Sequence, residues 1–260
     1  MREVIQHEPG TFCWPELATT DADSAKALYG ALFDWTFDDQ SPEPGTTYTT
    51  VRRAGRDVAA LYVLQKSQRQ RGVVAHWNSY AAVKSADESA LRVKVLGGTT
   101  VGAPFDVGPN GRMAIVKDPQ GATLCLWEAR AHPGAQVVGE IGTLCWTELA
   151  TTDLDAAGHF YASLFGWAIK KQETGPEAYI ELWKGPRPAG GMTTIAREQG
   201  ATEPAWSVYF RVADCDTAVA KAEALGARVI RKPDDIAKVG RYAFLADREG
   251  AAFAVIALAP

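Results

Sequence analysis

One long internal repeat constrains the fold of this chain more than any other feature of its sequence. The segment GTFCWPELATTDADSAKALYGALFDW, residues 10–35, returns as GTLCWTELATTDLDAAGHFYASLFGW, residues 142–167. A repeat of this length indicates that the 260-residue chain contains two similar halves. We therefore predict two domains, residues 1–130 and 131–260, each of ordinary size and each able to bury a core.

Each copy of the repeat predicts a strand followed by an amphipathic helix. In the first copy, apolar side chains recur at helical spacing at Ala25, Leu28, Tyr29, Leu32 and Phe33. The Thr-Thr-Asp run before each helix provides an acceptor for the unpaired N–H groups of the first turn. We therefore predict that Asp21 and Asp153 are helix caps and that the aromatic residues of the apolar stripe belong to the core.

A second strand-helix pattern follows within each half. In the first half, strands are predicted near Thr46–Arg52 and Val58–Leu64, and the polar stretch Lys66–Gly72 reads as a connection. The pattern then restarts with a strand at Ala75–Val83 and a helix at Ser85–Leu96 that ends at two glycines. Three further strands complete the half, near residues 99–101, 112–117 and 122–127. The second half repeats this order.

Composition and charge exclude several classes of protein. The formal net charge of -4 and the scattered Lys and Arg residues provide no basic face, so nucleic acid is not an expected partner. No apolar run reaches the length of a membrane span, the polar N-terminal stretch lacks a signal-peptide core, and the four cysteines form no disulfide framework. These features predict a cytoplasmic protein without a membrane partner. The short connection at Ala129–Ile141 predicts that the two domains pack on each other, in a monomer or a homodimer.

The four strand-helix-strand-strand-strand modules, together with the Asp-Pro-Gln-Gly turn at Asp118–Gly121, resemble the vicinal oxygen chelate superfamily. This superfamily includes glyoxalase I, bleomycin resistance proteins and extradiol dioxygenases. The second half keeps the turn as Asp247–Gly250. More closely, the chain resembles the tandem glyoxalase-like proteins of actinobacteria that are often labelled hydroxylases. The resemblance implies an α+β fold of two tandem domains, each with two βαβββ modules that form a curled, cup-like mixed sheet with helices outside.

The resemblance also implies where a divalent metal would bind. Superfamily enzymes take His, Gln or Glu ligands from inward positions of particular strands, because first-row metals need nitrogen or carboxylate donors. The corresponding positions here are Trp14, Asn78 and Cys125 in the first domain and Trp146, Ser207 and Ala254 in the second. Since an indole offers no lone pair and the other groups are poor ligands, we expect no metal cofactor at the usual site. An unusual divalent-metal set of His76, Glu16 and Cys125 remains the alternative.

The expected concave face offers an aromatic wall with a few polar groups. In the first domain, strand alternation places there Trp14, Glu16, His76, Asn78, Tyr80, Cys125 and Trp127. In the second domain, the ligand-binding candidates are Trp146, Glu148 and Tyr209, beside Ser207, Ala254 and Ile256. Such a wall suits a flat or apolar small molecule, although the same aromatic residues could simply fill the inside of the sheet.

Glu16 is the best catalytic candidate. A carboxyl group buried among aromatic rings should have a raised pKa, and it could then act as a general acid or base. The alternative is a structural salt bridge with Arg112 or Arg241.

Three functions follow from these expectations. The first is a small-molecule-binding protein of the glyoxalase and bleomycin resistance type that lacks the usual metal. The second is an enzyme: a metal-dependent glyoxalase, hydroxylase or dioxygenase, or a metal-free lyase or isomerase that uses Glu16. The third is a catalytically inert interaction protein. Polar groups are more numerous in the first cup, so we expect the site there.

Overall fold

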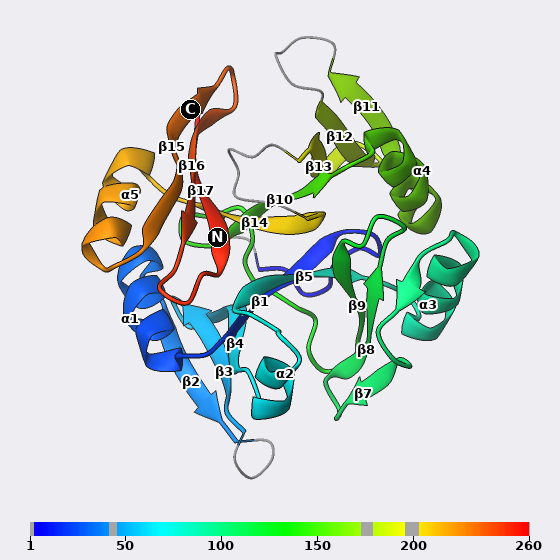
Figure 1. Cartoon of the computed structure of the whole chain (residues 1–260), viewed down its shortest axis with the longest axis horizontal. Helices are drawn as coiled ribbons and strands as arrows, with labels where there is room; N and C mark the ends of the chain where they lie inside the picture. Colours follow the sequence, from blue (N-terminus) through cyan, green and yellow to red (C-terminus); the bar gives the residue numbers. More distant parts are fainter. Residues whose placement is uncertain (1–2, 42–45, 173–178, 196–202, 260) are drawn as a thin grey trace.

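The computed structural model describes residues 3–41, 46–172, 179–195 and 203–259. Each half of the chain forms one mixed sheet (Figure 1). The elements of the first half are β1 (Phe12–Thr19), α1 (Ala22–Phe33), β2 (Thr36–Gln40), β3 (Tyr48–Arg53), β4 (Arg56–Val63), α2 (Lys66–Gln70), β5 (His76–Ala82), α3 (Ala86–Val95), β6 (Thr99–Thr100), β7 (Phe105–Val107), β8 (Gly111–Lys117) and β9 (Thr123–Ala129). Those of the second half are β10 (Leu144–Thr151), α4 (Leu154–Phe165), β11 (Ala168–Gln172), β12 (Tyr179–Lys184), β13 (Arg187–Thr194), β14 (Ala205–Arg211), α5 (Cys215–Ala224), β15 (Arg228–Ile236), β16 (Gly240–Ala246) and β17 (Ala252–Leu258).

The opening strand of each repeat lies at the centre of its sheet. The first sheet has the order β2-β3-β4-β1-β5-β9-β8-β6, with β7 paired to β8, and the second has the order β11-β12-β13-β10-β14-β17-β16-β15. β1 runs parallel to β4 and antiparallel to β5, and β10 makes the same two pairings with β13 and β14. The two modules of each domain therefore meet along their first strands. This confirms the predicted α+β class and the tandem arrangement.

Three details differ from the sequence prediction. The expected connection after β4 contains the short helix α2. Strands β2 and β11 were not predicted, because their sequences TFDDQ and AIKKQ carry no apolar alternation; both are edge strands, where one side faces solvent. β15 continues to Ile236 through Pro233, which an edge strand tolerates because no partner needs its missing N–H.

The opening helices are capped as predicted. The Asp21 side chain accepts a hydrogen bond from the Ser24 backbone N–H at 3.0 Å, and Asp153 accepts one from Ala156 at 2.9 Å. Each carboxylate satisfies one of the amide groups that have no partner inside the helix. Both residues therefore stabilise helix ends. Among the described helices, none has the length and apolar character required to cross a membrane.

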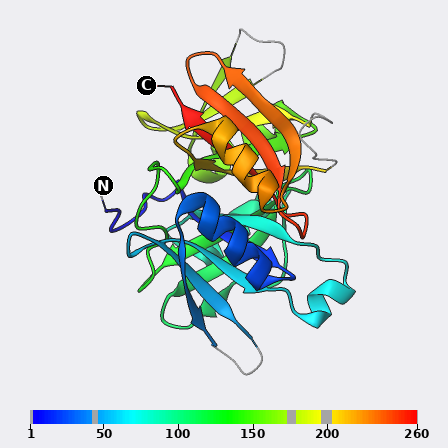
Figure 2. The same ribbon diagram turned by 90° about the vertical axis from the view of Figure 1, so that its left-hand side faces the viewer.

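The two domains share their largest apolar cores, whereas the sequence suggested one core for each. Helix α1 lies beside α5 of the other half (Figure 1; Figure 2), and α3 lies beside α4 (Figure 1). One core combines the apolar stripe of α1 with residues of β14, α5 and β17, and the other combines α3, β8 and β9 with α4, β12 and β13. Two smaller apolar clusters fill the concave faces of the individual sheets. The domains are therefore packed together, as expected, but the helix-bearing face of each is buried by its neighbour.

Buried tyrosines connect each opening helix to the glycine turn of the other domain. The Tyr29 hydroxyl donates to Asp247 at 3.1 Å and accepts a hydrogen bond from the Trp77 indole at 3.1 Å. The equivalent group in the other half is Tyr161, which donates to Asp118 and accepts from Trp206. Each aspartate also accepts two backbone N–H groups of its own turn. The turns Asp118–Gly121 and Asp247–Gly250 thus both contribute to the contact between the domains.

The ends of the repeats also meet across this contact. The Trp35 indole donates to the Gly142 carbonyl and the Trp167 indole donates to the Gly10 carbonyl, both at 2.7 Å. Gly142 and Gly10 have φ values of 76° and 87°, which favour glycine. A side chain at Gly142 would also place its Cβ 2.7 Å from the Phe33 carbonyl oxygen. The first and last residues of the repeat are therefore required by the domain interface.

We predict that Tyr29→Phe and Tyr161→Phe each lower the free energy of unfolding by about 1–3 kcal/mol, because each removes one donor to a buried aspartate and leaves a buried indole N–H without its acceptor. Urea denaturation of the purified variants measures this loss. Lys171→Ala, which removes an exposed ion pair with Asp155, is the control and should change stability by less than about 0.5 kcal/mol. Losses for both tyrosine variants within the control range would contradict the role of these hydrogen bonds.

Candidate functional site

The concave face of the first sheet gathers the residues that the sequence placed there. Trp14 pairs with Tyr80 across β1 and β5, Glu16 pairs with Asn78, and Tyr80 pairs with Cys125 of β9. A β-bulge between Phe12 and Trp14 turns Phe12 to the opposite face, where its ring lies 4.8 Å from that of Trp206. The floor of this cup is an apolar cluster that contains Trp14, Tyr80, Cys125 and Trp127.

Glu16 lies in this floor and is held by two phenols. Its side chain is only 8% exposed, and its Oε2 accepts a hydrogen bond from the Tyr80 hydroxyl at 2.7 Å. Tyr48 of β3 donates a second hydrogen bond, and the Trp14 indole in turn donates to Tyr48. Burial raises the pKa of Glu16 despite these two donors, because removal of water penalises the carboxylate more than two phenols stabilise it. The group is therefore biased toward its neutral acid form.

The second sheet repeats the same network. The Tyr209 hydroxyl donates to Glu148 at 2.8 Å, Tyr179 also bonds to Glu148, and the Trp146 indole donates to Tyr179 at 3.1 Å. Glu148 is again 8% exposed. The sequence analysis missed Tyr48 and Tyr179, although both stand at the same place in the two halves, at the first residue of β3 and of β12. A comparison of equivalent positions in the two halves could therefore have identified both tyrosines from the sequence.

The predicted salt-bridge partners of Glu16 lie elsewhere. Arg112 pairs with Asp87 at 2.6 Å and with Asp106 at 3.2 Å. Arg241 makes the equivalent pairs with Asp216 and Asp235. The alternation of side chains along β8 explains why Arg112 does not reach Glu16. Met113 faces the cup with Trp127, so its neighbour Arg112 points to the opposite, helix-bearing side, toward α3. The salt-bridge alternative for Glu16 was wrong.

Three half-buried polar side chains, Tyr62, His76 and Asn78, lie at one edge of the first cup, which we call its mouth. His76 and Asn78 lie there on β5, and the His76 Nε2 atom is 3.2 Å from the Asn78 Oδ1 atom. Tyr62 of β4, which the sequence analysis did not single out, faces the Asn78 amide, and burial raises its pKa to about 12. The equivalent strand positions in the second sheet carry Ala205, Ser207 and Thr193. The structure therefore supports the expectation that polar groups are richer in the first cup.

The segment between the domains covers one end of this cup. The Trp127 indole donates to the His132 carbonyl at 2.9 Å, and the His132 ring packs edge-on against Trp14 at 4.6 Å. The Ala135 backbone N–H donates to the Cys13 carbonyl at 2.8 Å. Burial lowers the pKa of His132, which favours the neutral imidazole. The segment that contains His132 therefore shields Trp14 and Trp127 from solvent.

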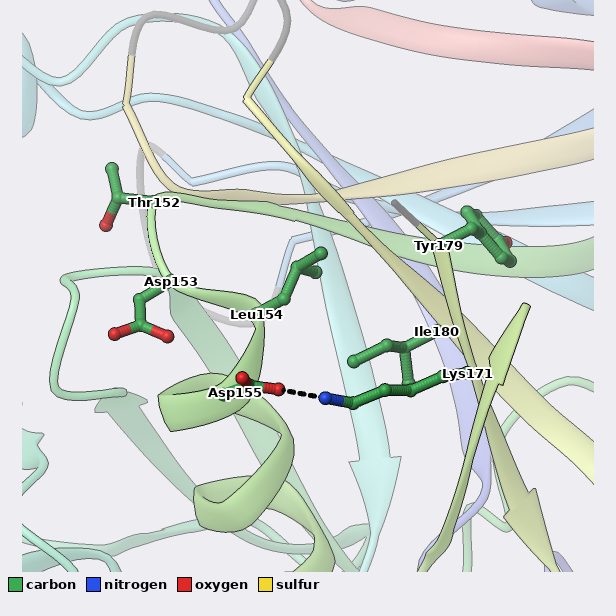
Figure 3. A pocket seen from close by; sticks show the side chains of 7 residues that line it. All are labelled: Thr152, Asp153, Leu154, Asp155, Lys171, Tyr179 and Ile180. Atoms are coloured by element: carbon green, nitrogen blue, oxygen red, sulfur yellow. Dashed lines mark hydrogen bonds and ion pairs between the residues drawn. The ribbon is translucent and has the colours of Figure 1, made fainter. Parts of the chain in front are cut away.

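A surface pocket of about 350 Å³ lies outside both aromatic floors (Figure 3). It is bounded by the first turn of α4 and by β11 and β12, and the Asp155–Lys171 ion pair of 2.7 Å spans it. Asp153, which also lines it, is occupied as the helix cap. Asp155 and Lys171 are exposed and paired with each other, and Tyr179, which also lines the pocket, is bonded to Glu148, so the pocket is a weaker candidate than the first cup.

Comparison with known proteins identifies the family. Residues 11–126 match the model of the glyoxalase/bleomycin resistance protein/dioxygenase superfamily, and residues 146–256 match that of a glyoxalase-like domain. The "Putative glyoxylase CFP32" of Mycobacterium bovis is 38% identical over 262 residues, which cover 100% of this chain and 99% of that protein. The chain belongs to the glyoxalase/bleomycin resistance protein/dioxygenase superfamily.

Other relatives carry different names. The "Anthracycline biosynthesis protein DnrV" of Streptomyces peucetius is 35% identical over 98% of this chain and 96% of its own length. Among solved structures, the Mn(II)-bound glyoxalase from Novosphingobium aromaticivorans aligns with a TM-score of 0.64 at 12% identity, over 96% of this chain and 82% of that one. The 2,2',3-trihydroxybiphenyl 1,2-dioxygenase of Sphingomonas wittichii aligns with a TM-score of 0.65 at 14% identity, over 96% and 90%. At these identities the structural matches establish the shared superfamily fold.

The residues of this chain do not fit the divalent metal that the superfamily implies. Trp14 lies at the first ligand position with its indole bonded to Tyr48, and burial raises the pKa of Cys125, which disfavours the thiolate that a metal would need. Within the described segments, no three His, Cys, Asp or Glu side chains are grouped as a metal site. The alternative set of His76, Glu16 and Cys125 is therefore not assembled, because the His76 nitrogens are occupied by Val74 and Asn78.

We predict that Glu16→Gln changes how stability depends on pH. Since the folded-state pKa of Glu16 is raised above 4.5, the wild-type protein should lose stability as the pH rises from there through the folded-state value. The glutamine variant should lack this component, because an amide does not ionise. Urea denaturation between pH 5 and pH 8 measures the difference, with the exposed Glu223→Gln as the control for loss of one charge. Parallel pH profiles for wild type and Glu16→Gln would contradict a raised pKa.

Proposed function

We propose that the chain binds a small planar aromatic or apolar molecule at the concave face of the first sheet, without a divalent metal such as the Mn(II) of the solved Novosphingobium aromaticivorans glyoxalase. The observation that carries the proposal is a buried acid held by two phenols within an aromatic floor, beside a half-buried polar mouth. Aromatic rings supply contact area for a flat ligand, and a few polar groups orient it. The neutral acid form of Glu16 is compatible with an uncharged ligand above it.

The names of two relatives support the aromatic part of this proposal. Proteins of Streptomyces peucetius and of Streptomyces sp. strain C5, 35% and 34% identical to this chain, are named anthracycline biosynthesis proteins. Anthracyclines are planar polycyclic compounds. A flat ring system therefore agrees both with those names and with the aromatic floor of the cup. The division into domains at residue 130 belongs to the same proposal, and it is supported by sheets that span Phe12–Ala129 and Leu144–Leu258.

Glu16 supports a second candidate function, that of a metal-free lyase or isomerase. A neutral carboxylic acid can transfer its proton to an oxygen atom of the substrate, and hydrogen bonds from Tyr48 and Tyr80 would stabilise the carboxylate left behind. The raised pKa of Glu16 is the specific observation that favours this role. Ligand binding is common to both candidates, and turnover of the bound compound separates them.

Metal analysis tests the first part of the proposal. Elemental analysis of the purified protein, followed by calorimetric titration with zinc, nickel, manganese and iron(II) under reducing conditions, should show no stoichiometric binding. This outcome is expected because the ligand positions carry Trp14, Asn78 and Cys125. One tightly bound metal per domain would contradict the proposal and would direct the search to metal-dependent glyoxalase and oxygenase substrates.

Ligand titration tests the location of the site. A screen of planar aromatic compounds by quenching of tryptophan fluorescence should find ligands, since Trp14 and Trp127 lie in the floor. Asn78→Leu should then weaken binding about ten-fold, because it removes a polar contact at the mouth. Ser207→Leu, at the equivalent position of the second sheet, is the matched control and should leave affinity unchanged. Equal effects of the two variants would show that the first cup is not the preferred site.

A further inference from the structure

The concave face of the second sheet is more open to solvent than that of the first at one end. Trp14 of β1 is 4% exposed, whereas the equivalent Trp146 of β10 is only half-buried. The strands beneath the two indoles match, since Trp14 pairs with Tyr80 of β5 and Trp146 pairs with Tyr209 of β14. The difference in exposure therefore comes from what covers each indole.

The first half shows which kind of group fits against this indole. The His132 ring packs on Trp14 with the ring centroids 4.6 Å apart and an interplanar angle of 88°. The His132 carbonyl is held there by the Trp127 indole. Among the described residues, no ring packs on Trp146 in this way. The chain thus supplies its own small aromatic ring to the first face and leaves the equivalent surface of the second face open.

A half-buried arginine stands beside this open surface. Arg211 occupies the strand position that Ala82 has in the first half, and it pairs with Ile256 of β17. Ile256 and Tyr209 both belong to the apolar cluster of the concave face, so alternation places the Arg211 side chain on the same face. Because Tyr209 pairs with Trp146, Arg211 is the diagonal neighbour of that indole, which a long side chain can reach.

The Arg211 guanidinium pairs with no carboxylate among the described residues. Its Nη1 atom donates to the Gly139 carbonyl at 2.9 Å, which leaves other N–H donors of the planar group for a ligand. By contrast, Arg231, whose Cζ atom lies 5.1 Å from the centre of the Tyr242 ring on the same face, is paired with Asp234. A charge that is partly removed from water without a counter-ion costs free energy. Arg211 therefore favours an anion at this end of the face.

We propose that the second concave face binds a small aromatic carboxylate, whose ring packs on Trp146 and whose carboxylate is bound by Arg211. A carboxylate supplies the missing counter-charge and can accept two hydrogen bonds from one guanidinium. The ring gives Trp146 the contact that His132 gives Trp14. This site is separate from the one proposed in the first sheet, and its chemistry goes beyond that function because it selects for negative charge.

The neighbouring side chains are compatible with such a ligand. Ile256 stands where the first half has Trp127, and the smaller side chain leaves space beside Arg211 for a ring. The acid of the same face, Glu148, pairs with Ser207. Ser207 lies four residues before Arg211, which corresponds to about 13 Å along β14. The bound carboxylate is therefore kept away from the one buried acid of this network.

A matched pair of probes tests the selectivity for charge. 2-Naphthoate and 2-naphthalenemethanol share one ring system, and only 2-naphthoate is negatively charged at neutral pH. Calorimetric titration in a low-salt buffer should show that the wild-type protein binds 2-naphthoate about ten-fold more tightly, as a charge-assisted hydrogen bond predicts. Added sodium chloride should weaken 2-naphthoate binding and leave 2-naphthalenemethanol binding unchanged, because salt screens the charge of a half-buried arginine.

Substitution of the arginine tests the position of the site. Arg211→Met keeps an apolar stem and removes the charge, so it should abolish the preference for 2-naphthoate and leave 2-naphthalenemethanol affinity unchanged. Arg53→Met is the matched control. Arg53 is also half-buried, and its Nε atom donates to the Phe33 carbonyl at 3.2 Å, so the control loses the same charge and a bond of the same kind. The control should keep the preference.

The outcomes separate this inference from the proposed function. Equal affinities of the wild-type protein for the two probes, binding of neither probe, or a preference that survives Arg211→Met would each overturn the carboxylate site. The salt dependence needs no variant, so an absence of salt dependence would overturn it even if Arg211→Met did not fold. A result against neutral planar ligands in the first cup would leave this inference standing, since Trp146 and Arg211 belong to the other sheet.

Discussion

Each repeat begins with a carbonyl group that accepts a hydrogen bond from the final tryptophan of the other repeat. These two bonds, from Trp35 to Gly142 and from Trp167 to Gly10, close the contact between the domains at both ends. The buried hydrogen bonds of Tyr29 and Tyr161 lie between them. The helices that cover each sheet are packed against the neighbouring domain, so neither half could bury its apolar helix stripe alone. The two concave faces are left on the other side of the sheets, away from this contact.

The concave faces of the two sheets share a buried network and differ in the polar side chains beside it. Duplication gave each sheet the same buried network of an indole, two phenols and a carboxyl group. The mouths then differ, since Tyr62, His76 and Asn78 in the first sheet correspond to Thr193, Ala205 and Ser207 in the second. Both domains therefore share the buried acid, whereas the first sheet carries the larger polar side chains at these three positions.

Much of the fold could be predicted from the sequence, because strand alternation and the helical stripe are local patterns. The caps at Asp21 and Asp153 and the inward positions of Trp14, Glu16, Tyr80 and Trp127 follow from such patterns. Edge strands β2 and β11 were missed, since an edge strand exposed to solvent needs no apolar alternation. The partners of Glu16 were also missed, because Tyr48 and Tyr80 come from strands that are remote in sequence and opposite charge was the more obvious source of a partner.

The sequence by itself determined that the chain is a duplicated pair of α+β domains and that its concave faces are aromatic, because the repeat and the alternation are written in adjacent residues. The tertiary structure decided what those residues do. It assigned the repeated Gly, Tyr, Trp and Asp positions to the domain interface, and it placed Tyr62, Asn78 and His76 together at the mouth of the first cup. Contacts of this kind depend on sheet register and on the packing of segments that are far apart in the chain, and no local sequence pattern specifies them.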